Sequence, residues 1–207
     1  YFYTRLGNPT CGHVEEKIAA LEGGVGAMLT SSGQAATLTS VLTIAKAGDR
    51  ILCSASVYGG TFNLMAVTFK RMGIEVDFFE QSESDEEIAK RIYPNTKAIF
   101  GETIANPALT VFDISRFAAL AHKHEIPLII DNTFATPILC KPFDFGADIV
   151  VHSTTKFLDG HAVQVGGVVV DSGKFDWAKS SKFPEFTTPD DSYHGLIYTQ
   201  AFGNQAF

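Results

Sequence analysis

Residues 128–156 read LIIDNTFATPILCKPFDFGADIVVHSTTK, and this stretch decides the fold. It contains two short apolar runs, Leu128–Asp131 and Asp148–Val151. Runs of four or five almost uninterrupted apolar residues are typical of strands that are buried on both faces, as in a parallel sheet covered by helices. The first run ends on the carboxylate of Asp131, and the second leads into hydroxyl groups and a lysine at Ser153–Lys156.

The same alternation extends over most of the chain. Three further runs predict strands, at Arg50–Cys53, Glu75–Phe79 and Lys97–Phe100. Val14, Ile18 and Leu21 fall on one helical face and predict a first helix that ends at Gly23-Gly24. A second helix is predicted from about Gly33 to Ala47, closed by Gly48. Amphipathic helices are predicted at Thr61–Arg71 and Ile114–His124. Strands that alternate with helices predict an α/β fold with a mostly parallel sheet flanked by helices.

The ends of the chain are less regular. Beyond about Gly173 the pattern weakens, and Phe183–Phe186 with Thr188–Asp191 predicts a long loop over the surface or towards a neighbouring molecule. The sequence starts without a methionine and stops at Phe207 in an apparently structured stretch, so we expect a fragment of a longer protein.

Composition excludes several classes of function. The net charge is −7 and no basic stripe is present, which argues against a nucleic-acid partner. No apolar run approaches the roughly 20 residues of a membrane helix, and the start does not resemble a signal peptide. The three cysteines, Cys11, Cys53 and Cys140, are scattered, which fits a reducing compartment. We therefore expect a cytoplasmic protein that binds neither nucleic acid nor membrane.

Chemistry in a parallel sheet gathers at the carboxyl ends of the strands. Four segments follow predicted strands there: Ser54–Thr61, Glu102–Pro107, Asp131–Thr136 and His152–Lys156. A carboxylate such as Asp131 can keep a pyridine nitrogen protonated, and a lysine such as Lys156 can form an imine with a carbonyl.

Anion-binding groups accompany this pair. Thr30–Gln34 precedes the second predicted helix, whose first amides are a natural anion site. Taken singly, a strand-terminal aspartate is often a helix cap, and a lysine after a strand is usually solvated. Together these groups favour an anionic carbonyl cofactor. The glycines of Gly23–Gly26 lack the spacing of a dinucleotide loop, and the histidines lack the spacing of a metal site.

Six motifs resemble the Cys/Met-metabolism family of pyridoxal-phosphate (PLP) enzymes, which includes cystathionine γ-synthase, cystathionine lyases, methionine γ-lyase and O-acetylhomoserine sulfhydrylase. They are Tyr3–Thr10, Ser31–Ala36, Tyr58–Thr61, Glu102–Pro107, Asp131–Thr133 and Ser153–Lys156. The resemblance implies the large cofactor domain of the aspartate-aminotransferase-like enzymes, known as fold type I. We expect residues 1–207 to form this PLP-binding domain, with an N-terminal arm segment and a C-terminal substrate domain outside the chain.

The resemblance also implies residue roles. Lys156 would carry the cofactor and move protons, Asp131 would pair with the pyridine nitrogen, and Tyr58 would stack on the ring and assist proton transfer. The other implied contacts are Gly33 and Gln34 amides and Ser153 and Thr155 hydroxyls to the phosphate, Asn106 near the phenolic oxygen, and Tyr3 and Arg5 to the phosphate of an adjacent subunit. The working unit would then be a homo-oligomer, a dimer of dimers.

Weaker signals concern the activity within the family. Gly60 stands where methionine γ-lyases usually have a cysteine, and Tyr193–Tyr198 resembles a loop of O-acetylhomoserine sulfhydrylases. We predict γ-replacement, in which a sulfide or thiol replaces the acetate of O-acetylhomoserine. Cystathionine γ-synthase or methionine γ-lyase activity remain alternatives. So does a catalytically inert, self-associating fragment, because no arginine here matches the family's carboxylate-binding motif.

Overall fold

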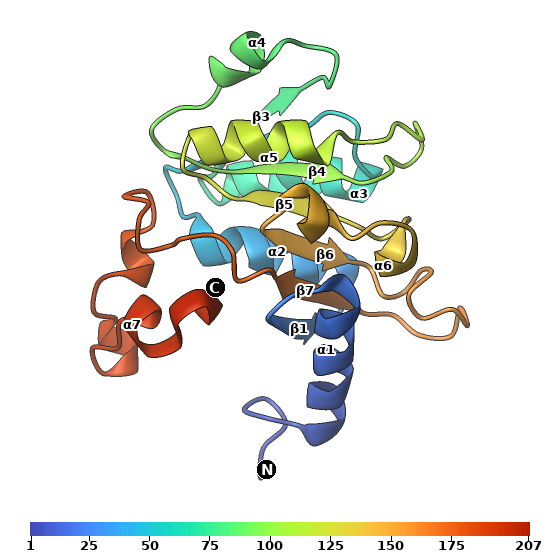
Figure 1. Ribbon diagram of the computed structural model, residues 1–207, viewed down its shortest axis with the longest axis vertical. Helices are drawn as coiled ribbons and strands as arrows, with labels where there is room; N and C mark the ends of the chain where they lie inside the picture. The colour runs from blue at the N-terminus through green and yellow to red at the C-terminus, as the bar shows by residue number, and fades with distance from the viewer.

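A computed structural model describes residues 1–207, and its centre is a seven-stranded sheet in the order β1-β7-β6-β5-β4-β2-β3. The strands are β1 (Gly26–Thr30), β2 (Arg50–Ser54), β3 (Glu75–Phe79), β4 (Thr96–Glu102), β5 (Leu128–Asp131), β6 (Ile149–His152) and β7 (Gly167–Asp171). Strands β2 to β6 pair in parallel, whereas β7 is antiparallel to both β6 and β1. Strands β3 and β1 form the two edges, at the top and bottom of the sheet in Figure 1.

All five predicted strands are confirmed, and the mostly parallel sheet with them. The sequence analysis missed β1 and β7, which close one side of the sheet as an antiparallel pair. The signal for β7 was present, because Gly167–Asp171 holds three consecutive valines. Strand β1 is weaker in sequence, and none of its residues is fully buried. Its place depends on pairing with β7, a partner far along the chain.

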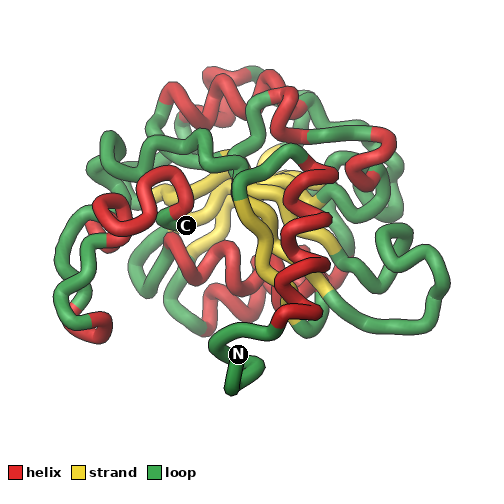
Figure 2. The backbone as a smooth tube through the Cα atoms, turned by 60° about the horizontal axis from the view of Figure 1, so that its bottom comes forward, coloured by secondary structure: helices red, strands yellow, loops and turns green.

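Helices cover both faces of the sheet, as Figure 2 shows by the red segments on either side of the yellow strands. The helices are α1 (Pro9–Glu22), α2 (Gly33–Ile44), α3 (Gly59–Asn63), the π-helical η1 (Leu64–Phe69), α4 (Asp85–Ala89), α5 (Ile114–Lys123), α6 (Thr136–Leu139) and α7 (Tyr198–Phe202), with short 3-10 turns η2 (Pro142–Phe145), η3 (Pro184–Phe186), η4 (Asp191–Tyr193) and η5 (Gly203–Gln205). None of the helices has the length and apolar character needed to cross a membrane.

The ends of the first two helices show how well local sequence signals predict where a helix stops. Helix α1 ends as predicted, with Gly23 in the left-handed conformation at φ 80°. The prediction for α2 was wrong at its end, because the helix stops at Ile44 and Ala45 is extended. The amide of Lys46 donates to Asp49 Oδ2 at 2.9 Å, so a local turn replaces the last helical turn that we expected.

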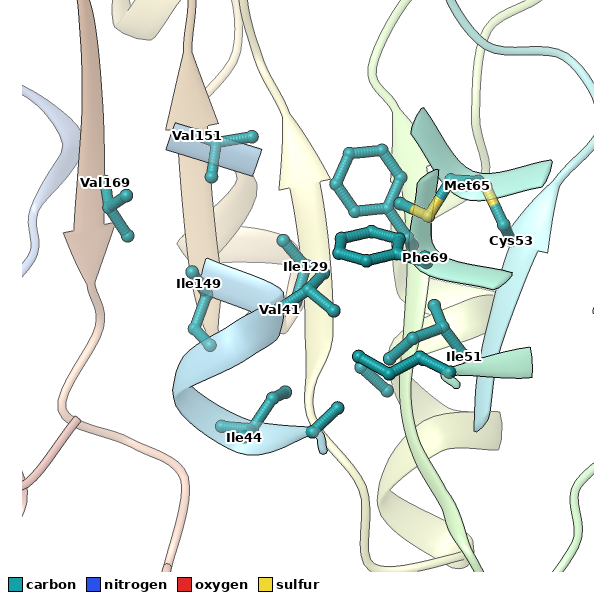
Figure 3. Close-up of a cluster of buried hydrophobic side chains, with 14 of the residues drawn as sticks. Val41, Ile44, Ile51, Cys53, Met65, Phe69, Ile129, Ile149, Val151 and Val169 are labelled. Carbon is teal, nitrogen blue, oxygen red and sulfur yellow. The ribbon is translucent and has the colours of Figure 1, made fainter. Parts of the chain in front are cut away.

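Two apolar cores lie on opposite faces of the sheet. One packs α2 and η1 against the strands, and Figure 3 shows Val41 and Ile44 of α2 lying over Ile129 and Ile149 of the sheet. The other packs α1 and α5 against the alternate residues of the same strands, such as Ile130. A strand buried on both faces needs apolar residues at every position, which explains the near-continuous runs in the sequence.

The segment after Gly173 corrects one part of the expectation of a surface loop: Thr188, Pro189 and Asp191 are exposed as expected, but aromatic side chains before them are buried. Phe183 is fully buried and Phe186 nearly so. Both pack on Trp177, with ring centroids 5.0 Å and 4.6 Å from the indole. Aromatic rings bury large apolar areas without regular secondary structure, so this segment is held by packing that has no sequence period.

Candidate active site

The carboxyl ends of the parallel strands meet the N-terminus of α2 around a cavity of about 230 Å³. Its position matches the edge of the sheet at which parallel α/β proteins bind ligands. The cavity is lined by Ser32, Gly33, Gln34, Tyr58, Glu102, Ile104, Asn106, Asp131, Thr133, Phe134, Ser153, Thr155 and Lys156. The structure therefore brings together eight residues that the sequence analysis selected, from five separate segments of the chain.

Asp131 is the last residue of β5, and its carboxylate is held from one side. Oδ1 accepts hydrogen bonds from the amide of Thr133, at 3.0 Å, and from the Thr133 hydroxyl. Burial raises the pKa of Asp131 above its usual value, while the bonds from Thr133 and the nearby charge of His152 act in the opposite direction. A positively charged group in the cavity would favour the ionised carboxylate.

The N-terminus of α2 provides the candidate anion site. The first amides of a helix have no partner within the helix. Here Ser32 Oγ accepts from the amide of Ala35 and the Ser32 carbonyl accepts from Ala36, which leaves the amides of Gly33 and Gln34 for a ligand. A Cβ on Gly33 would lie 2.5 Å from that of Ser153, so only glycine allows this close approach of helix and loop.

The loop after β6 brings Ser153, Thr155 and Lys156 to the same side. The amide of Ser153 donates to Thr133 Oγ1 at 2.9 Å, which links this loop to the one that holds Asp131. Thr155 Oγ1 donates to the carbonyl of Gly166 and accepts from its amide, so that hydroxyl also fixes the loop ahead of β7. Lys156 is exposed at the cavity.

Tyr58 lies at the start of α3, lines the cavity and is 49% exposed. The ring occupies the space beside Gly60: a Cβ on Gly60 would come within 2.5 Å of Tyr58 Cε1. A glycine at this position therefore permits the observed ring orientation. Asn106 lines the same cavity from the loop after β4.

Two predicted site residues lie elsewhere. Tyr3 and Arg5 precede α1 and do not line the cavity, and the Arg5 guanidinium instead lies 4.9 Å from the centre of the Tyr3 ring. Figure 1 shows this N-terminal segment extending away from the sheet beneath α1. Their contact with an adjacent subunit stays a prediction.

Sequence reasoning gave no role to five residues of the cavity wall: Ser32, Glu102, Ile104, Thr133 and Phe134. Glu102 and Thr133 both stand in the motifs, and Glu102 ends a strand as Asp131 does. Glu102 is only 5% exposed. Burial and the charge of Asp131 raise the pKa of Glu102 to about 8, although two backbone amides that bind it act in the opposite direction.

The residues present fit pyridoxal phosphate. The cavity offers an amine for the aldehyde, a carboxylate for the ring nitrogen, a flat aromatic side chain, and helix amides with a close-packed glycine for the phosphate. The family model described as Cys/Met metabolism PLP-dependent enzyme matches residues 1–199. The chain belongs to this family.

Relatives in the Cys/Met-metabolism family agree with this assignment. The chain is 51% identical over 209 residues to O-acetyl-L-homoserine sulfhydrylase of Corynebacterium glutamicum, covering 99% of this chain and 48% of the relative. It is 48% identical over 209 residues to homocysteine/cysteine synthase of Saccharomyces cerevisiae, covering 100% and 47%. The chain spans about half the length of the curated relatives it matches.

A solved structure is similar as well. A Campylobacter jejuni protein assigned as an O-acetylhomoserine (thiol)-lyase superposes with a TM-score of 0.90 and 38% identity, covering 94% of this chain and 47% of that one. That protein carries N'-pyridoxyl-lysine-5'-monophosphate. The predicted family and the PLP-enzyme fold are thus confirmed, while the roles of individual residues stay predictions.

Proposed function

We propose that the protein performs γ-replacement on O-acetylhomoserine, in which sulfide or a thiol displaces acetate and homocysteine or methionine is formed. The observation that carries the proposal is the cavity that joins Lys156, Asp131 and the α2 amides, in a chain whose relatives are named homocysteine synthase and O-acetylhomoserine sulfhydrylase.

Asp131 and Lys156 have separate roles in this proposed reaction. Bound pyridoxal phosphate supplies an electron sink for a carbanion next to the substrate's amino group. Asp131 keeps the ring nitrogen protonated, which preserves that sink. Lys156 binds the cofactor aldehyde and moves protons at the α- and β-carbons of the substrate.

Further residues hold the cofactor in place. The amides of Gly33 and Gln34 bind the phosphate, with the hydroxyls of Ser153 and Thr155 beside them. The ring of Tyr58 stacks on the cofactor and assists proton transfer, and Asn106 lies near the phenolic oxygen. The remaining predicted contacts, Tyr3 and Arg5, bind the phosphate of an adjacent subunit, so we propose a homo-oligomer built as a dimer of dimers. The three free cysteines support a reducing, cytoplasmic location.

The substrate assignment is tested by two assays in parallel. One measures homocysteine from O-acetylhomoserine and sulfide, and the other measures methanethiol from methionine. We expect the first reaction to be faster, because Gly60 stands where methionine γ-lyases usually have a cysteine and Tyr193–Tyr198 resembles a loop of O-acetylhomoserine sulfhydrylases. Faster methanethiol release would contradict the proposal and favour methionine γ-lyase activity, and efficient use of cysteine as the thiol would favour cystathionine γ-synthase.

A second candidate function is cofactor binding without turnover by the 207-residue chain alone. It is favoured by the cavity wall, which contains no arginine to bind a substrate carboxylate. A bidentate arginine fixes the orientation of a substrate, and its absence can cost several powers of ten in rate. The test is a steady-state assay of this chain with cofactor, O-acetylhomoserine and sulfide. Turnover well above that of free pyridoxal phosphate would exclude this candidate.

A further inference from the structure

Glu102 is a buried carboxylate in the cavity wall with none of the proposed cofactor contacts. It is the last residue of β4 and the register partner of Asp131 on β5. Side chains of register partners lie on the same face of a sheet, so both carboxylates face the cavity. Two neighbouring carboxylates repel one another, and that cost needs a compensating gain.

The gain lies in what Glu102 holds. Oε1 accepts a hydrogen bond from the amide of Tyr58 at 2.6 Å, and Oε2 accepts one from the amide of Asn106 at 3.2 Å. Tyr58 belongs to the loop after β2, and Asn106 belongs to the loop after β4. One side chain therefore joins the backbones of two residues that line the cavity from different strands.

The chemistry of these bonds favours a carboxylate over an amide. Both partners are N–H donors, and an ionised carboxylate presents only acceptors. A glutamine could accept from one amide, but its NH₂ group would face the other donor. A cation at Asp131 would also reduce the repulsion that raises the pKa of Glu102, so a protonated ring nitrogen and the ionised Glu102 favour each other.

We propose that Glu102 is a positioning residue that fixes the backbones of Tyr58 and Asn106 relative to each other. It thereby sets the positions of these two residues against the cofactor ring. The inference rests on the proposed function only in taking this cavity as the pyridoxal-phosphate site. It concerns the binding of the cofactor and is independent of the substrate.

The test combines Glu102→Gln and Glu102→Ala with two readouts. Amide hydrogen exchange of Tyr58 and Asn106, measured by NMR on the protein with bound pyridoxal phosphate, should be about tenfold faster at one of the two amides in E102Q and at both in E102A. The dissociation constant for pyridoxal phosphate should rise about tenfold in E102Q and further in E102A. The visible circular dichroism of the bound cofactor should change in both variants, because displacement of Tyr58 and Asn106 changes the asymmetric surroundings of the cofactor ring.

Asp148→Asn is the matched control. Asp148 is also buried and also accepts from a backbone amide, that of Leu128 at 2.8 Å, but it precedes β6 at the other end of the sheet. D148N should leave the Tyr58 and Asn106 amides, the cofactor affinity and the dichroism unchanged.

Wild-type exchange at both amides together with wild-type cofactor affinity in E102Q would overturn the proposal. If E102A does not fold, E102Q decides alone, because a glutamine keeps one of the two bonds. Neither readout uses a substrate. Failure of the assays with O-acetylhomoserine would therefore contradict the proposed function and leave this test intact.

Discussion

Glu102 and Asp131 face one cavity as register partners, but only Asp131 has an oxygen available to a ligand. Backbone amides occupy both oxygens of Glu102. Thr133 occupies only Oδ1 of Asp131, so Oδ2 is the acceptor that a protonated ring nitrogen can reach. The roles that we propose for these two carboxylates differ accordingly: Asp131 would bind the cofactor, and Glu102 would hold the cavity wall.

Asp131→Asn should lower turnover by about a hundredfold or more while cofactor still binds. A neutral amide cannot hold the ring nitrogen in its protonated form, and loss of one preorganised electrostatic partner costs rate on this scale. Turnover and cofactor absorbance, measured on the same preparation, check the prediction. A variant with the wild-type rate would show that Asp131 only caps the loop through Thr133.

Lys156 should be the residue bonded to the cofactor. Borohydride reduction of the protein with pyridoxal phosphate, followed by peptide mapping, should place the label on the peptide that contains Lys156. Lys156→Ala is the control, and it should bind cofactor without being labelled. A label on Lys141 or on any other lysine would disprove the assignment.

Gly60→Ala should lower turnover by about tenfold or more, since a Cβ at this position would lie 2.5 Å from the ring of Tyr58 and would displace it. Gly59→Ala is the matched control, because a Cβ there meets nothing within 4 Å. G59A should stay within about twofold of wild type. Equal effects of the two substitutions would show that the position of the Tyr58 ring is not what matters. Kinetics and cofactor affinity of both variants provide the measurement.

Removing the Glu102 carboxyl should flatten the pH dependence of folding stability. The pKa of Glu102 is raised in the folded state to about 8, so its stabilising contribution is present below the unfolded value of 4.5 and is lost as the pH rises through about 8. Urea unfolding of the cofactor-free protein at pH 5 and pH 8.5 should show a smaller loss of stability for E102Q than for wild type. Asp171, with its pKa raised to about 6, contributes in the lower part of this range in both proteins and cancels in the comparison. An identical pH dependence in the two proteins would contradict the raised pKa.

Glu22→Ala should destabilise the fold by about 3–5 kcal/mol, because it leaves two buried polar groups, those of His152 and Asn132, without their partner. Glu22 Oε1 accepts from His152 Nε2 at 2.6 Å and from Asn132 Nδ2 at 3.0 Å, and both Glu22 and His152 are fully buried. Chemical denaturation of E22A, of His152→Leu and of the double variant forms a thermodynamic cycle. The double variant should lose less than the sum of the single variants, and simple additivity would show that the pair is not coupled.

Sequence patterns were sufficient for the parallel part of the sheet, because each strand there is buried on both faces and its apolar run is a local property. They also indicated where the strands end, and hence the neighbourhood of Asp131 and Lys156. Ala45 to Ala47 were wrongly assigned to α2, since the competing hydrogen bond to Asp49 is a turn interaction that apolar periodicity does not report.

What the sequence by itself determined is therefore the α/β alternation, the family through its motifs, and the residue types gathered at the strand ends. Only the tertiary structure decided that β1 and β7 complete the sheet as an antiparallel pair, that Phe183 and Phe186 are buried against Trp177, and that Glu102 joins Tyr58 to Asn106. The physical reason is the range of the interactions. Periodicity and strand length are properties of neighbouring residues. Strand pairing, burial and the sharing of one carboxylate by two loops depend on residues that are distant in the chain.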